Sequence, residues 1–170
     1  PKEMKFIDLV MEVNPHQVTL VPDSEGQLTS DHGWDTIKHK EYLKEIIAAF
    51  RKQNIRTSIF VDADITMIRG AKETWTDRIE LYTESYAKQF PTDCSSAVKP
   101  FSIAAKSAMD LGLGVNAGHD LNLDNLKYFK DNVPGLLEVS VGHALIADAL
   151  YLGLEATIHK YLTQLKWISL

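Results

Sequence analysis

The chain has 170 residues, of which 45% are hydrophobic and 24% charged, so residues 1–170 are expected to form a single domain with a substantial core. Its formal net charge of −5 argues against non-specific nucleic-acid binding, and no apolar run approaches the roughly 18 residues of a membrane span. The first residues lack the form of a signal peptide, and a lone cysteine, Cys94, excludes an internal disulfide framework, so a cytoplasmic location is expected.

The hydrophobic pattern predicts helices and strands in alternation. A helix at 2–13 is followed by a strand at 16–22, which Pro22 ends, and by a helix at 35–53 that Asp31 or Asp35 caps. The remaining predicted elements are a strand at 55–64, a short helix at 65–75, a strand at 78–87, a polar loop at 88–99, a helix at 100–112, a strand at 113–117, a helix near 123–131, a strand at 135–142 and a long amphipathic helix at 144–166.

Because a helix follows each predicted strand, the fold class is α/β with a parallel sheet and right-handed crossovers. A doubly wound sheet would carry its phosphate loop after the first strand, but that loop has one glycine near its start, Gly26. Glycines instead follow the last two strands, where a (β/α)8 TIM barrel binds phosphate. This favours the barrel, with roughly the first three strands, about 70 residues, missing before the chain.

Polar residues gather where the predicted strands end, which is where βα enzymes place their chemistry. His119 follows the strand at 113–117, and an imidazole there suits proton transfer at neutral pH, although it would also fit a histidine bonded only to its own loop. Gly142 and His143 precede the last helix, whose free N–H groups favour an anion. A tight strand-to-helix turn would explain the same pair.

Glu80 lies inside the strand at 78–87, on the face opposite Ile79 and Leu81. A carboxylate there is costly unless it is paired or functional, so a structural ion pair and a catalytic role both stay open. Asp64 is expected to cap the next helix, and Asp62 has no assigned role. The six histidines lack metal-ligand spacing, so no metal site is expected.

The chain resembles the pyridoxine 5′-phosphate synthase family over essentially its whole length. The segments that carry the resemblance are VTLVPD, LTSDHGWD, SIFVDAD, IELYTESYA, GLGVNAGHDLNLDNL and VSVGHALIADALYLGLEATIHKYL. It implies a (β/α)8 barrel that condenses 3-amino-2-oxopropyl phosphate with 1-deoxy-D-xylulose 5-phosphate, giving pyridoxine 5′-phosphate, phosphate and water. It also implies a homo-oligomer built on dimers that needs no metal or organic cofactor.

By position in the family motifs, His119 would be a proton donor and Glu80 would stabilise the transition state. The resemblance also implies that Thr29 binds deoxyxylulose phosphate, and that the amino-ketone phosphate meets the residues Asp120, Gly142 and His143. Asp120 stands where some members carry glycine; a contact with the ligand through its backbone N–H would tolerate this change, whereas a contact of its carboxylate with phosphate would not. The alternatives are another barrel isomerase or aldolase acting on sugar phosphates, and a non-catalytic phosphate-binding fragment.

Overall fold

Helices and strands alternate along the chain, as predicted. The computed structural model describes residues 2–22 and 29–166, with side chains from residue 6 onward, and Gly26 lies outside these ranges. The elements are α1 Lys2–Val13, β1 Gln17–Leu20, α2 Lys40–Lys52, β2 Arg56–Val61, α3 Ile65–Glu73, β3 Arg78–Tyr82, α4 Glu84–Gln89, α5 Cys94–Asp110, β4 Gly114–His119, α6 Leu126–Asn132, β5 Leu136–Val141, α7 His143–Leu152 and α8 Leu154–Leu165.

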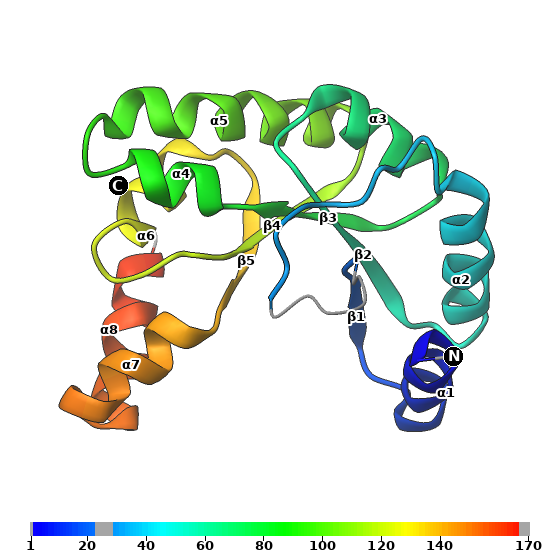
Figure 1. Cartoon of the computed structure of the whole chain (residues 1–170), viewed down its shortest axis with the longest axis horizontal. Helices are drawn as coiled ribbons and strands as arrows, with labels where there is room; N and C mark the ends of the chain where they lie inside the picture. Colours follow the sequence, from blue (N-terminus) through cyan, green and yellow to red (C-terminus); the bar gives the residue numbers. More distant parts are fainter. Residues whose placement is uncertain (1, 23–28, 167–170) are drawn as a thin grey trace.

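Within the described residues, the strands pair in parallel and in chain order, β1-β2-β3-β4-β5. Figure 1 shows that the sheet is curled, with helices along its outer side. The side chains of Gln17 in β1 and Glu138 in β5 meet directly, with 2.9 Å between Nε2 and Oε2. In a flat sheet these strands would lie about 19 Å apart, four spacings of about 4.8 Å, which is too far for the two side chains to meet. The sheet is therefore a curled half-barrel.

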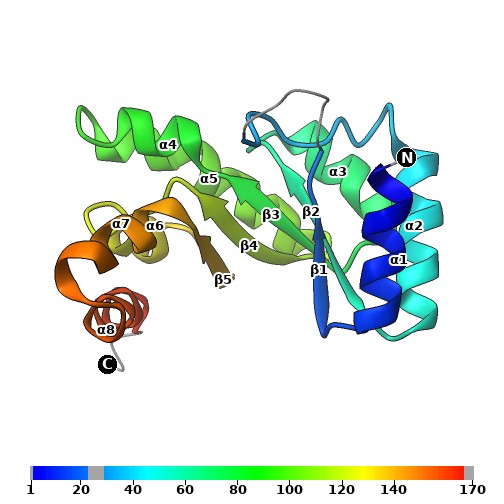
Figure 2. The same cartoon turned by 60° about the horizontal axis from the view of Figure 1, so that its bottom comes forward.

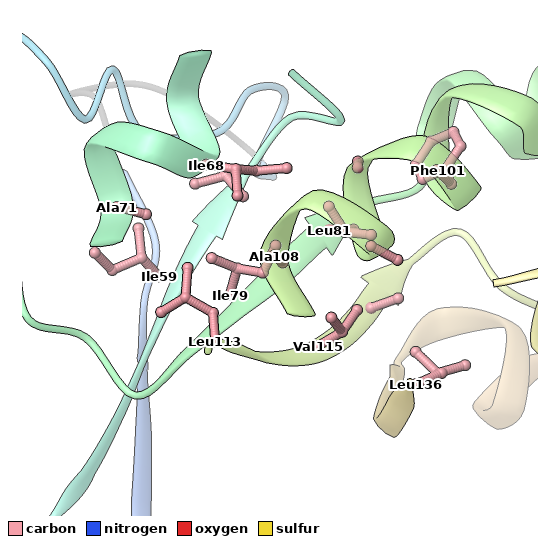
Figure 3. Close-up of a cluster of buried hydrophobic side chains, with 14 of the residues drawn as sticks. Ile59, Ile68, Ala71, Ile79, Leu81, Phe101, Ala108, Leu113, Val115 and Leu136 are labelled. Carbon is pink, nitrogen blue, oxygen red and sulfur yellow. The ribbon is translucent and has the colours of Figure 1, made fainter. Parts of the chain in front are cut away.

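The hydrophobic core lies between the convex face of the sheet and the helices outside it. Alternate residues of the central strands point to this side, and Figure 3 shows Ile59, Ile79, Leu81 and Val115 packed with side chains of the covering helices. Each of these four is fully buried, which contributes about 1.5–3 kcal/mol for a large aliphatic side chain. The intervening residues of the same strands face the concave side, where the polar groups lie.

The segment from 78 to 112 differs from its prediction. The predicted strand at 78–87 is too long, because β3 ends at Tyr82 and α4 follows. The helical path buries the ring of Tyr86 against Phe101 and Phe129, with ring centroids 6.0 and 4.9 Å away. The predicted polar loop at 88–99 is also wrong, because Asp93 caps α5 by accepting a hydrogen bond from the N–H of Ser96, so the helix begins at Cys94 rather than at residue 100.

The predicted helix at 144–166 is two helices, α7 and α8, which Gly153 separates. Gly153 has a φ of +82°, a conformation that favours glycine and ends α7. The Tyr161 hydroxyl donates to Asp148 at 2.8 Å and ties α8 back to α7. Figure 1 and Figure 2 place this helix pair at the β5 edge of the sheet, and α1 beside α2 at the β1 edge. Among the described residues, no helix combines the length and the apolar character that crossing a bilayer requires.

Candidate active site

His119 ends β4 and occupies the centre of the polar groups at the carboxyl ends of the strands. Its backbone has a φ of +106°, which is rare for a residue with a side chain and costs about 1–3 kcal/mol. The imidazole Nε2 lies 2.9 Å from the Thr29 hydroxyl, and Nδ1 lies 2.7 Å from a carboxylate oxygen of Asp120. The ring also packs edge-on against Tyr82, 5.2 Å between centroids. Strain retained at a residue with this many polar partners is typical of a functional site.

Glu80 projects from the middle of β3 into the concave face and is 7% exposed. Its carboxylate accepts a hydrogen bond from the Thr19 hydroxyl of β1 at 3.0 Å and another from Ser140 of β5. Burial raises the pKa of the Glu80 carboxyl above its ordinary value, although both hydroxyl groups act in the opposite direction. From the sequence, a structural ion pair and a catalytic role both stayed open for Glu80. In the structure, its carboxylate accepts hydrogen bonds from hydroxyl groups.

Gly118 makes room for this carboxylate. A Cβ atom at Gly118 would lie 2.7 Å from Oε1 of Glu80 and 2.9 Å from the backbone oxygen of Ser140. Contacts below 3.0 Å are essentially never seen for a real Cβ, so a side chain at this position would displace Glu80 or the neighbouring strand. Its bare backbone is therefore part of the site.

The turns at 118–120 and 142–143 lie side by side, as expected for the ends of two neighbouring parallel strands. In the register of β4 and β5, Gly118 pairs with Ser140 and His119 with Val141. The rings of His119 and His143 are consequently 6.4 Å apart. Gly142 is the N-cap of α7 and supplies no side-chain cap, and a Cβ built on it meets no atom of residues 2–22 or 29–166 within 4 Å. This leaves the helix start accessible to an anion.

Asp62 and Asp64, which follow β2, have structural contacts. Asp64 caps α3 by accepting hydrogen bonds from the N–H groups of Thr66 and Met67, which confirms the prediction. Asp62 accepts a hydrogen bond from the N–H of Gly33 at 3.2 Å. Gly33 and Thr29 belong to the same connection between β1 and α2. The hydrogen bond from Gly33 to Asp62 therefore holds this connection against the end of β2, in the position where Thr29 reaches His119.

A second polar cluster lies deeper in the concave face, near the amino ends of the strands, and we call it the lower polar layer. At its centre Glu138 accepts hydrogen bonds from Arg78 at 2.6 Å and Arg56 at 3.2 Å. Burial alone would raise the pKa of the Glu138 carboxyl, but the hydrogen bond from Gln17 and the two arginine cations hold it below its ordinary value. The described strands each contribute one member to this layer, namely Gln17, Arg56, Arg78, Asn116 and Glu138.

Several neighbours of the site were not predicted as site residues. Thr19 and Ser140, which hold Glu80, lie on the first and last described strands and become its neighbours only because the sheet curls. Tyr82 could have been found, since it follows Glu80 by two positions and therefore shares its face. Burial raises the pKa of the Tyr82 hydroxyl to about 12, so Tyr82 remains neutral at physiological pH.

Cavity size does not single out this site. In the described part of the chain, a cavity of about 500 Å³ lies between α3 and α5, and another of about 80 Å³ lies at the start of β5. Neither is lined by Glu80, His119 or Gly142. The described residues also contain no group of three or more His, Cys, Asp or Glu side chains placed to hold a metal ion. The position of the strand ends is what brings the candidate residues together.

Comparison with known proteins relates the chain to a family of named enzymes. A family model described as pyridoxal phosphate biosynthesis protein PdxJ matches residues 2–167. A pyridoxine 5′-phosphate synthase from Christiangramia forsetii is 65% identical over 162 residues, which cover 95% of this chain and 68% of that protein. The enzyme of the same name from Flavobacterium johnsoniae is 60% identical over 161 residues, 95% of this chain and 68% of that protein. A third, from Bacteroides thetaiotaomicron, is 57% identical over 157 residues, 92% of this chain and 66% of that protein. The chain thus spans about two thirds of the length of these relatives.

Proposed function

The chain belongs to the PdxJ family of pyridoxal phosphate biosynthesis enzymes, and we propose that it carries the pyridoxine 5′-phosphate synthase reaction. In this reaction 3-amino-2-oxopropyl phosphate condenses with 1-deoxy-D-xylulose 5-phosphate, and ring closure releases phosphate and water. The observation that carries the proposal is the meeting of a buried carboxylate, an imidazole and an uncapped helix start at one end of the sheet.

Phosphate recognition is the first role that this geometry supports. Gly142 and His143 open α7, where free backbone N–H groups and the helix dipole favour an anion. The phosphate of the amino ketone would bind here, next to the imidazole of His119. Thr29, which reaches His119 from the segment after β1, would bind deoxyxylulose phosphate. Asp120 would contribute its backbone N–H, which donates to Thr83 across a long 3.3 Å contact.

Acid–base chemistry is the second role. Imine formation and ring closure need several proton transfers, and His119 presents Nε2 beside Thr29 as the proton donor. Positive charge develops on nitrogen during imine formation, and the ionised Glu80 carboxylate would stabilise that charge. Because its named partners are hydroxyl groups rather than cations, this stabilisation is available to the transition state. No metal or organic cofactor is assigned a part in these steps.

The complete protein would be a (β/α)8 barrel and a homo-oligomer built on dimers. The curl that joins Gln17 to Glu138, and the greater length of the relatives, support the barrel. Exposed apolar side chains on α7 support burial of this helix in an interface, since Leu150 and Tyr151 are 82% and 90% exposed. The cytoplasmic location remains a prediction from the lone cysteine.

Incubation of the complete protein with both phosphorylated substrates tests this function. We expect pyridoxine 5′-phosphate and inorganic phosphate to appear together and only when both substrates are present. Replacing His119 with Asn should lower turnover on the order of 100-fold or more and leave substrate binding largely intact. His159→Asn, an exposed histidine on α8, is the matched control and should behave as the unmodified protein. Turnover of one sugar phosphate alone would point to an isomerase or aldolase and contradict the proposal.

A further inference from the structure

His119 and Asp120 are neighbours in sequence, yet their side chains meet at the end of β4. In a regular strand, consecutive side chains point to opposite faces of the sheet, so they cannot hydrogen-bond to each other. Here the φ of +106° at His119 turns the backbone, and Oδ2 of Asp120 comes to 2.7 Å from Nδ1 of the imidazole. The unfavourable backbone conformation of His119 therefore allows this side-chain contact with Asp120.

The contact lies in surroundings that strengthen it. The side chains of His119 and Asp120 are 21% and 23% exposed, so the pair is more buried than a surface ion pair. Aromatic rings of Tyr82 and Phe60 lie beside the imidazole, with centroids 5.2 and 6.5 Å away. Lower local polarity makes a hydrogen bond to a carboxylate stronger than it would be in water.

Hydrogen bonds with neighbouring buried residues hold the backbone around Asp120. Thr83, which is buried, donates its hydroxyl hydrogen to the backbone oxygen of Gly118 at 2.9 Å and accepts from the N–H of Asp120. The amide of Asn125, also buried, donates to the backbone oxygen of Asp120 at 3.2 Å. The carboxylate is thus presented to His119 by an anchored turn.

An ionised carboxylate only accepts hydrogen bonds, so Nδ1 of His119 must carry the hydrogen in this pair. That leaves Nε2, on the side of Thr29, as the nitrogen that exchanges protons. We propose that Asp120 is a positioning residue, whose carboxylate holds the Nδ1–H of His119 so that Nε2 faces the substrate, takes up a proton there and, in the imidazolium form, donates it. This inference rests on the proposed function, in which His119 is the proton donor, and adds a role for the Asp120 side chain.

The first test reads the hydrogen position directly, on the complete protein without substrate. Nitrogen-15 spectra of the imidazole groups report which ring nitrogen carries hydrogen, and the His119→Asn variant assigns the signals. We expect His119 to carry hydrogen on Nδ1 in the unmodified protein, to lose this preference in Asp120→Gly, and to retain part of it in Asp120→Asn, whose side-chain oxygen still accepts. An unchanged His119 signal in Asp120→Gly would overturn the proposal.

The second test separates positioning from substrate contact. Asp120→Gly should lower kcat on the order of 10-fold to 100-fold, the range seen when a metal-binding histidine loses its orienting carboxylate. KM for both substrates should stay within about twofold, because the backbone N–H remains. The kcat of Asp120→Asn should lie between those of the unmodified protein and Asp120→Gly. Asp124 is an exposed carboxylate in the same loop, and Asp124→Asn should change neither kcat nor KM. A lower KM with unchanged kcat would show that the carboxylate faces substrate phosphate, which overturns the positioning role.

The two tests also keep this inference separate from the proposed function. If the unmodified protein forms no pyridoxine 5′-phosphate, the proposed function fails, while the nitrogen spectra still decide whether Asp120 sets the hydrogen position of His119.

Discussion

Glu80 and Glu138 are two carboxylates on the same concave face of one sheet, and their surroundings shift their pKa values in opposite directions. Glu138 lies in the lower polar layer, where Arg56 and Arg78 hold its pKa below the ordinary value. Glu80 lies nearer the carboxyl ends of the strands with the hydroxyl groups of Thr19 and Ser140, and burial raises its pKa. The charge of Glu138 is neutralised by two arginine cations. Within the described residues, the charge of Glu80 has no such ion pair and can interact with a positive charge on a substrate.

This contrast shows how a polar sheet face can be divided between stability and chemistry. The lower polar layer joins the described strands through paired charges, which favours one arrangement of the sheet. The layer above it carries strain and an unneutralised carboxylate, both of which oppose folding. Such costs are expected where a site must complement a transition state rather than the resting protein. Variants of the two glutamates should therefore separate activity from stability.

The largest effect is expected for Glu80→Gln. Activity should fall about 100-fold, because the variant removes the charge to which we assign stabilisation of the transition state. Stability should change in the opposite direction. Since the folded protein binds the Glu80 proton more tightly than the unfolded chain, its stability falls as pH rises from the ordinary value of 4.5 through the raised pKa. The glutamine variant lacks this loss, so its free energy of unfolding at neutral pH should exceed that of the unmodified protein.

Urea unfolding at several pH values, together with product formation, measures both quantities. A glutamine variant that is less stable than the unmodified protein at neutral pH would show that Glu80 is a structural residue, and the comparison with Glu138 would collapse.

A smaller effect is expected for Gly118→Ala, about 10-fold on kcat, because the new methyl group would push the Glu80 carboxylate out of position.

Gly142→Ala is the informative counterpart. Its methyl group meets no atom of the described residues within 4 Å, so we assign its effect to contact with the bound phosphate. We expect KM for the amino-ketone phosphate to rise about 10-fold, with kcat less affected. Steady-state kinetics with each substrate varied in turn distinguishes the two variants, and equal effects on kcat would contradict the assigned roles.

The smallest effect is expected for Glu138→Gln, about 1 kcal/mol of unfolding free energy at neutral pH, because solvent partly screens the pair with Arg78. Activity per folded molecule should change little. The depressed pKa of Glu138 gives stability that is present above the ordinary value of 4.5 and is lost as pH falls through the folded value. The difference between the two proteins should therefore shrink in acid.

Glu41→Gln, which removes an exposed carboxylate on α2, is the matched control for Glu138→Gln and should leave stability nearly unchanged. A Glu138 variant indistinguishable from this control would mean that the lower polar layer adds nothing to stability.

Local sequence signals predicted the parts of the site that depend on one strand or one turn. Alternation placed Glu80 opposite Ile79 and Leu81, and the position of Asp64 after a strand predicted its cap. The adjacency of the turns at 118–120 and 142–143 followed from parallel pairing of neighbouring strands.

The rest depends on geometry that single segments do not contain. Thr19 reaches Glu80 only through the curl of the sheet, and Glu138 faces Arg78 only after a register shift between β4 and β5. The helix α4 was missed because burial of Tyr86 among aromatic rings outweighed the local preference for strand. The contact between Asp120 and His119 depends on the positive φ of His119, which the residue types in this segment do not predict.

The hydrogen bond between Gln17 and Glu138 joins residues 121 positions apart in the chain. Closing loops that large costs chain entropy, so we expect such contacts to form late, after the folding transition state. The lower polar layer should then be absent from the folding transition state, and its main kinetic contribution is to delay unfolding. We therefore expect loss of the contact between Gln17 and Glu138 to speed unfolding more than it slows folding.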